Sequence, residues 1–207
     1  MAYIWINPVV DKMYDAEELN LFLRRKGYER FYTSEDWLEI VRDKYKSVVE
    51  NTNCVVADVR CPKMLEVLEE MELTSKMCVP DIKPILIHCG QEGSKRADLA
   101  DKEKIITTPC QSLADMGNAL QFKNTRFIPW NQFIAQLGEE PLRIQPKESP
   151  IPPGFFSSFD GKIESVTGEE EIRSYFANGI PEGVTLVELL YCKDGCHNGD
   201  GIRGCTK

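Results

Sequence analysis

Short apolar runs alternate with longer amphipathic segments along most of the chain, and this alternation constrains the fold more than any other feature of the sequence. The apolar runs predict strands at residues 3–7, 54–59, 84–89, 104–108, 126–128, 162–166 and 185–191. The amphipathic segments predict helices at residues 15–25, 34–49, 111–120, 130–137 and 168–178, and a further helix that opens at Pro62. Strands that alternate with helices are typical of an α/β fold. We therefore expect mostly parallel sheets flanked by helices.

A polar stretch that is rich in proline interrupts this pattern at residues 139–153 and predicts a linker. On this division, residues 1–138 form an α/β lobe and residues 154–207 form a C-terminal segment. This division is compatible with an architecture of two lobes.

The composition excludes several classes of protein. The chain has 207 residues, of which 42% are hydrophobic, so it can form a real core and disorder is not expected. Its net charge of -8 argues against broad capture of nucleic acid. No apolar run approaches the ~20 residues of a membrane-spanning helix. The N-terminus also lacks the basic start and the long apolar stretch of a signal peptide, so we expect a cytoplasmic protein.

Eight cysteines and only two histidines are present. The cytoplasm keeps thiols reduced, so this number of cysteines indicates metal, cluster or redox chemistry rather than a disulfide framework. Three of the cysteines directly follow predicted strands, and Cys196 lies four residues after Cys192. The carboxyl ends of parallel strands share one edge of a sheet. We therefore expect four thiols to converge there: Cys61, Cys110, Cys192 and Cys196.

The two upstream thiols, Cys61 and Cys110, also lie where predicted helices begin. The dipole of a helix favours a thiolate at its N-terminus, and the thiolate is the form that binds iron. The remaining four cysteines are expected to be structural, because buried cysteine is common in cores. Cys54 is expected in the core, Cys78 in a loop and Cys205 in a tail, while Cys89 stays open as an additional ligand.

The C-terminal residues 188–201, with the sequence ELLYCKDGCHNGDG, combine two cysteines with a glycine-rich turn. This segment resembles the C-x-G-G-C-x-N-G-x-G signature of the iron-only ([FeFe]) hydrogenase large subunit, in its catalytic domain. In that family the two cysteines of the signature are ligands of the [4Fe-4S] part of the active cluster. The resemblance therefore implies that Cys192 and Cys196 bind a cluster.

Two upstream segments resemble motifs of the same family, in the same order. Arg60-Cys61-Pro62 resembles its Cys-Cys-Pro motif, and Thr108-Pro109-Cys110 resembles its Pro-Cys motif; each motif supplies one cluster ligand. The resemblance covers about residues 53–202 and implies a hydrogenase large-subunit-like fold. It also implies one [4Fe-4S] cluster on Cys61, Cys110, Cys192 and Cys196, and a redox partner such as a ferredoxin-like electron carrier.

The chain departs from this family at the positions that carry hydrogen chemistry. Arg60 stands where the family has the first cysteine of Cys-Cys-Pro, which is implicated in proton delivery. Leu113 stands where the family has a lysine that contacts the diiron unit. The interval from Cys110 to Cys192 is also much shorter than in hydrogenases. We therefore expect an iron-hydrogenase-like oxidoreductase at best, with electron transfer or redox sensing as its role and no hydrogenase activity.

Two other interpretations of the cysteines stay open. Four thiolates also suit a structural zinc ion, although C-x-x-x-C is a less typical zinc spacing than C-x-x-C. Alternatively, Cys192 and Cys196 form a thiol redox pair in a binding module that holds no metal.

Overall fold

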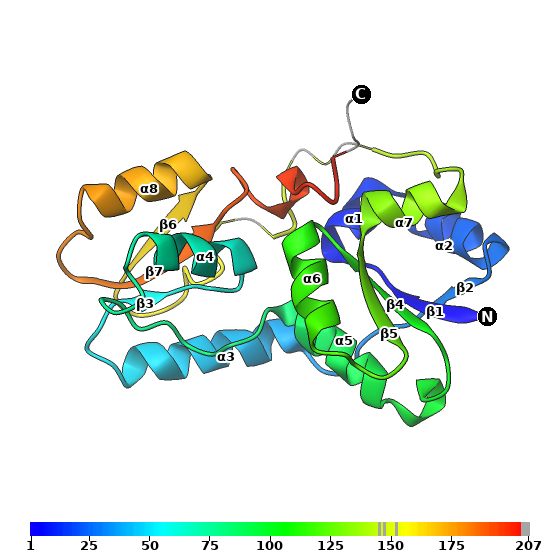
Figure 1. Cartoon of the computed structure of the whole chain (residues 1–207), viewed down its shortest axis with the longest axis horizontal. Coiled ribbons are helices and arrows are strands. Elements are labelled where there is room, and N and C mark those ends of the chain that lie inside the picture. Colours follow the sequence, from blue (N-terminus) through cyan, green and yellow to red (C-terminus); the bar gives the residue numbers. More distant parts are fainter. Residues whose placement is uncertain (145, 147, 152, 204–207) are drawn as a thin grey trace. The chain divides into compact units, whose positions relative to one another are not determined.

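The computed structural model describes residues 1–144, 146, 148–151 and 153–203, and these form two compact units (Figure 1). Unit 1 contains residues 1–35, 86–150 and the chain from residue 196 onward, and unit 2 contains residues 36–85 and 151–195. The units are therefore not contiguous in sequence, whereas the sequence predicted a lobe of residues 1–138 and a separate C-terminal segment. The difference arises because a strand near residue 56 pairs with one near residue 186, far along the chain.

Unit 1 is built on a four-stranded parallel sheet with the order β2-β1-β4-β5. Its strands are β1 (Ala2–Trp5), β2 (Tyr28–Arg30), β4 (Lys104–Thr108) and β5 (Thr125–Pro129). Its helices are α1 (Pro8–Met13), α2 (Ala16–Arg25), α5 (Ile85–Lys95), α6 (Gln111–Ala119) and α7 (Trp130–Leu137), with short 3-10 turns η1 (Ala97–Leu99) and η2 (Cys196–Asn198). Every residue of β4 is buried, so this strand lies at the centre of the unit.

The largest correction to the predicted elements concerns the predicted strand at residues 84–89, because residues 85–89 form the start of helix α5. A short apolar run does not by itself distinguish a buried strand from a buried helix. The buried positions continue to Gly90 and Gly93, which is a helical spacing. A Cβ atom at Gly90 would lie 2.3 Å from the Phe127 ring, and one at Gly93 would lie 2.8 Å from the Phe31 ring. The two glycines therefore let α5 approach the aromatic side chains on the sheet.

Unit 2 is built on a three-stranded parallel sheet with the order β3-β7-β6. Its strands are β3 (Val56–Ala57), β6 (Lys162–Thr167) and β7 (Val184–Leu190), and its helices are α3 (Trp37–Glu50), α4 (Pro62–Glu70) and α8 (Glu169–Ala177). The predicted strand 54–59 is thus reduced to two residues. Helix α3 begins later than predicted, because Asp36 and not Ser34 caps it. The other predicted strands and helices are present with small shifts of their ends.

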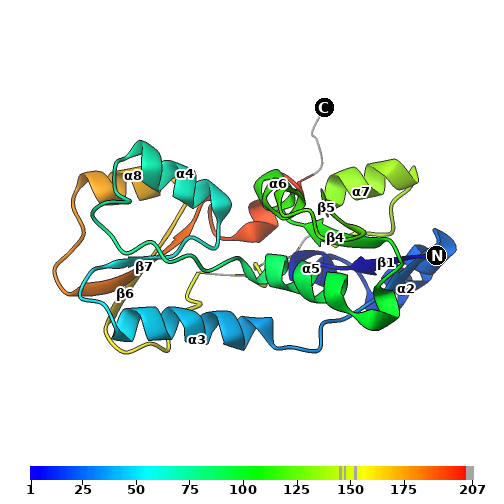
Figure 2. The same cartoon turned by 60° about the horizontal axis from the view of Figure 1, so that its bottom comes forward.

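Helices cover both faces of the unit 2 sheet, as Figure 2 shows. One face packs on α4 and α8, through Met64 and Leu68 of the first helix and Ile172 of the second. The other face packs on α3, where Val41 and Tyr45 meet Leu186 of β7. Strands buried on both faces read as continuous apolar runs, which is why β7 was predictable from its sequence. Two units of parallel strands with flanking helices confirm the predicted α/β class.

The described helices do not include one that combines the length and the apolar character needed to cross a bilayer.

Candidate functional site

Two of the four predicted ligands, Cys61 and Cys192, lie together in unit 2. Cys61 follows β3 and is the N-cap residue of α4, and Cys192 follows β7. Strands β3 and β7 are direct neighbours, with Ala57 opposite Val187, so their carboxyl ends lie side by side. The backbone N–H of Tyr191 donates a hydrogen bond to the Cys61 thiol. The Cys192 thiol is close enough that its charge affects the pKa of Cys61. The sheet therefore brings the first pair of thiols to one edge.

The protonation of Cys61 differs from the sequence prediction. The pKa of Cys61 is raised to about 11, mainly by burial and in smaller part by the charge of Cys192. Hydrogen bonds from the backbone N–H groups of Tyr191, Met64 and Lys63 lower the pKa, but they do not offset burial. The prediction that the start of α4 lowers the pKa of Cys61 is therefore wrong for the metal-free protein. The N–H groups nevertheless converge on the sulfur, as a thiolate ligand requires.

The other two predicted ligands, Cys110 and Cys196, belong to unit 1. Cys110 follows β4 and is the N-cap residue of α6, while Cys196 opens the turn η2. The Gly201 N–H donates to the carbonyl of Pro109 at 3.0 Å, and the Gly199 N–H donates to the carbonyl of Cys196 at 3.0 Å. The turn that starts at Cys196 therefore lies directly on the backbone beside Cys110.

Glycine is required in this turn because backbone meets backbone. A Cβ atom on Gly199 would lie 2.3 Å from the Pro109 carbonyl oxygen, and one on Gly201 would lie 3.0 Å from the Cys110 nitrogen. Asp200, between the two glycines, accepts a hydrogen bond from the Gln111 N–H at 3.0 Å and so caps α6. The glycine-rich motif thus has a structural reason: it docks the turn against the start of α6.

A cavity of about 510 Å³ opens beside this turn, within unit 1. Its walls include Gln111, Asp200 and Gly201 from the turn and the start of α6, and Trp130, Asn131 and Arg143 from α7 and the chain after it. It lies at the carboxyl ends of β4 and β5, where parallel sheets commonly place their sites. The cavity is therefore part of the same edge of the sheet as Cys110.

The remaining cysteines separate into exposed and packed positions. Cys54 is exposed in the turn before β3, so its predicted place in the core is wrong. Cys89 is buried within α5, and burial and the nearby Glu92 raise its pKa to about 12. Cys78 is half-buried against the α3 side of unit 2. Cys205 lies outside the described residues, and the seven described cysteines form no disulfide.

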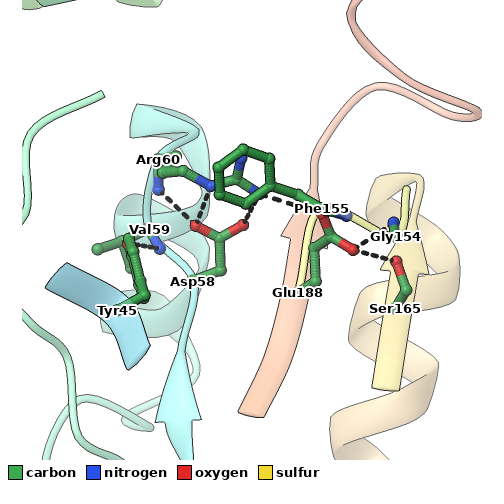
Figure 3. Close-up of polar contacts among 8 residues, drawn as sticks. All are labelled: Tyr45, Asp58, Val59, Arg60, Gly154, Phe155, Ser165 and Glu188. Carbon is green, nitrogen blue, oxygen red and sulfur yellow. Dashed lines mark hydrogen bonds and ion pairs between the residues drawn. The ribbon is translucent and has the colours of Figure 1, made fainter. Parts of the chain in front are cut away.

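Sequence reasoning missed a buried charge network next to Cys61, which Figure 3 shows. The Arg60 guanidinium contacts Asp58 through Nε at 2.9 Å and through Nη2 at 2.7 Å, and Nη2 also reaches Glu188 at 3.1 Å. The two carboxylate side chains have no exposure and the Arg60 side chain has 8%. A charged residue inside a strand that is otherwise apolar, as Glu188 is in TLVELLY, was the available signal.

The network also shifts the pKa of its members. Burial acts to lower the pKa of Arg60, but the carboxylates of Asp58 and Glu188 outweigh it and hold this pKa above its ordinary value. Burial raises the pKa of Tyr45 well above its usual range, and the charge of Asp58 raises it further. Arg60 is therefore charged and Tyr45 is neutral at any physiological pH.

Leu113, which the motif resemblance sets against a lysine of the hydrogenase family, is buried in α6 and has only 8% exposure. It packs as a core residue and offers no donor or acceptor. Among the described residues, no group of three or more His, Cys, Asp and Glu side chains is placed to hold a metal ion. Cys61 and Cys192 lie together in unit 2, and in unit 1 the turn that opens at Cys196 lies against the backbone beside Cys110.

No protein-family model, curated protein or solved structure matches the chain.

Proposed function

We propose that the chain binds one [4Fe-4S] cluster through Cys61, Cys110, Cys192 and Cys196, and that it serves electron transfer or redox sensing. The observation that carries the proposal is the pairing of these four residues. Cys61 lies with Cys192 at one sheet edge, and the turn that Cys196 opens lies on the backbone next to Cys110. Cys61 and Cys192 are 131 positions apart and Cys110 and Cys196 are 86 positions apart, so only the fold brings the two members of each pair near one another.

The donor set fits an iron–sulfur cluster. Cluster irons are held by four cysteine thiolates, and cluster sulfurs take hydrogen bonds from nearby backbone N–H groups. The three N–H groups around Cys61 supply such donors. When bound, the cluster would supply reversible exchange of one electron. The cysteines would hold it, and the N–H groups around them would tune its potential.

Two side chains argue against hydrogen chemistry. Arg60 holds the position of a proton-delivering cysteine, but its guanidinium is engaged by Asp58 and Glu188 and does not release a proton. Leu113 replaces the lysine and is packed in the core. We propose that the partner is an electron carrier, such as a ferredoxin-like protein, and that the chain works in the cytoplasm, where its thiols stay reduced.

The test is anaerobic purification, followed by measurement of iron, acid-labile sulfide and zinc, and electron paramagnetic resonance of the reduced protein. We expect about four irons and four sulfides per chain, with a signal from the reduced cluster. Zinc without sulfide would instead identify a structural zinc site. A protein that holds no metal after anaerobic reconstitution with iron and sulfide would overturn the proposal.

A further inference from the structure

A group of buried charged side chains lies beside Cys61 in unit 2. Arg60, Asp58 and Glu188 place two carboxylates and one guanidinium inside unit 2, so the group carries an excess of one negative charge. Burying ions is unfavourable unless their hydrogen bonds are complete. Both carboxylates have several donors here: Asp58 accepts from the Arg60 guanidinium, and the Glu188 carboxylate also accepts from the N–H of Phe155 and from the hydroxyl of Ser165 at 2.8 Å.

The first half of the network closes the loop that leads to Cys61. Asp58 Oδ1 accepts from the backbone N–H of Arg60 at 3.0 Å and from its Nε at 2.9 Å. The Asp58 N–H in turn continues the sheet ladder by donating to the Val187 carbonyl at 2.9 Å. The backbone of Arg60 is therefore fixed to β7, and Cys61 is the next residue along the chain.

The second half of the network reaches the strand that carries Cys192. Glu188 lies in β7, four residues before Cys192, and accepts from Arg60 Nη2. One guanidinium thus bridges Asp58, which directly follows β3, and Glu188 of β7, the two strands that the thiols follow in the chain. The aromatic rings of Phe155 and Phe156 lie over the same guanidinium, at 3.9 and 4.6 Å from its central carbon. These contacts depend on the planar guanidinium group of arginine and on its several N–H donors, which lysine lacks.

We propose that Arg60 is a positioning residue: its bridge from Asp58 to Glu188 fixes the Cys61 thiol beside the end of β7 and so sets the geometry of the Cys61–Cys192 pair. The bearing of this geometry on a cluster rests on the proposed function, whereas the positioning of the thiol does not.

The experiment compares wild type with Arg60→Lys and Arg60→Met. Arg60→Lys keeps the positive charge but removes the paired N–H donors of the guanidinium. Arg60→Met keeps only an apolar side chain of similar length. The matched control is Arg30→Met, because the Arg30 side chain is 9% exposed and pairs with Asp11 in unit 1. The first measurement is the rate of alkylation of each cysteine in the folded, metal-free protein, followed by mass spectrometry of its peptides. Cys78, in the same unit, is the internal reference.

We expect both Arg60 variants to speed alkylation of Cys61 about tenfold or more relative to Cys78, which corresponds to ~1.4 kcal/mol of local opening. Arg30→Met should leave the ratio at its wild-type value. A wild-type ratio in Arg60→Lys would show that charge alone suffices and would overturn the positioning role. Equal acceleration at Cys61 and Cys78 would show that Arg60 only stabilises the unit, and it would overturn the role as well.

The second measurement uses the anaerobically reconstituted protein. We expect Arg60→Lys to alter the line shape of the electron paramagnetic resonance signal, and Arg30→Met to leave it as in wild type. An unchanged signal in Arg60→Lys would overturn the link between Arg60 and the cluster. If wild type holds no cluster, the proposed function fails, while the alkylation ratio still decides whether Arg60 positions Cys61.

Discussion

The two thiol pairs are held by opposite means. In unit 2, side chains fix the approach to Cys61, because a buried arginine ties its loop to the neighbouring strand. In unit 1, backbone fixes the approach to Cys110, because Gly199 and Gly201 let the turn from Cys196 lie against Pro109. The comparison teaches that the proposed ligand positions of the two units should tolerate different changes. Unit 2 depends on the presence of particular charges, and unit 1 depends on the absence of side-chain volume.

The largest effect is expected when the charge network of unit 2 loses an acceptor. Glu188→Ala leaves Arg60 with Asp58 alone and removes the acceptor of the Gly154 and Phe155 N–H groups. Breaking a buried ion pair on one side costs about 3–5 kcal/mol. We expect a loss of this size in the free energy of unfolding, measured by urea denaturation.

Glu39→Ala is the control for Glu188→Ala. Glu39 pairs with Arg42 on the surface of the same unit, and its side chain is 54% exposed. Such pairs add little to stability, so this variant should unfold at nearly the wild-type urea concentration. If Glu188→Ala did the same, the network would not hold unit 2 together.

A smaller loss is expected when volume is added to the turn of unit 1. In Gly199→Ala the new Cβ atom would lie 2.3 Å from the Pro109 carbonyl oxygen, so the turn must move away from Cys110. Added volume in a packed site costs about 1–3 kcal/mol. We expect that loss in stability together with a fall in bound iron after anaerobic reconstitution.

Gly179→Ala separates the clash from a general effect of losing glycine. Gly179 has a φ of +84° and no neighbour within 4 Å of a new Cβ atom, so only its backbone becomes strained. That variant should lose stability, by about 1–2 kcal/mol, and keep its iron. Equal iron in the two variants would mean that the turn does not position Cys196.

The side-chain cap of helix α6 should contribute still less to the free energy of unfolding. Asp200→Ala removes the acceptor of the Gln111 N–H, and loss of such a cap costs about 0.5–2 kcal/mol. Because this cap comes from the Cys196 turn, we also expect Cys110 to be alkylated faster in the metal-free protein. Asp15→Ala is the matched control: Asp15 caps α2 through the Glu17 and Glu18 N–H groups and is far from Cys110 in the sequence. It should lower stability without changing the rate at Cys110.

The comparison of the two units also shows what a sequence can predict. Strand and helix periodicity was enough for the α/β class, because mostly apolar runs such as residues 184–190 alternate with amphipathic segments, a pattern typical of buried parallel strands covered by helices. It failed at residues 84–89, where the deciding information is the packing of Gly90 on the distant Phe127 ring. The division into units was equally hidden, because it depends on the pairing of β3 with β7.

Only part of the candidate site could be predicted from the sequence. The position of Cys61 and Cys192 at strand ends followed from the order of elements, and the structure places both beside each other in unit 2. The role of Arg60 did not follow, because its partner Glu188 lies 128 positions away and no local pattern links them. Iron binding itself stays a prediction.

The smallest effect separates two cysteines outside the predicted ligand set: Cys54, which was expected in the core, and Cys89, which was kept open as an additional ligand. Cys89 is 2% exposed within α5 of unit 1, whereas Cys54 is exposed before β3 in unit 2. Cys89→Ser puts a hydroxyl into an apolar site and should cost about 1 kcal/mol. Cys54→Ser should leave the thermal melt unchanged. Neither residue belongs to a thiol pair, so both variants should retain wild-type iron, measured on the same reconstituted samples as the melts. Loss of iron in Cys89→Ser would add a ligand to unit 1 and would break the symmetry of one pair in each unit.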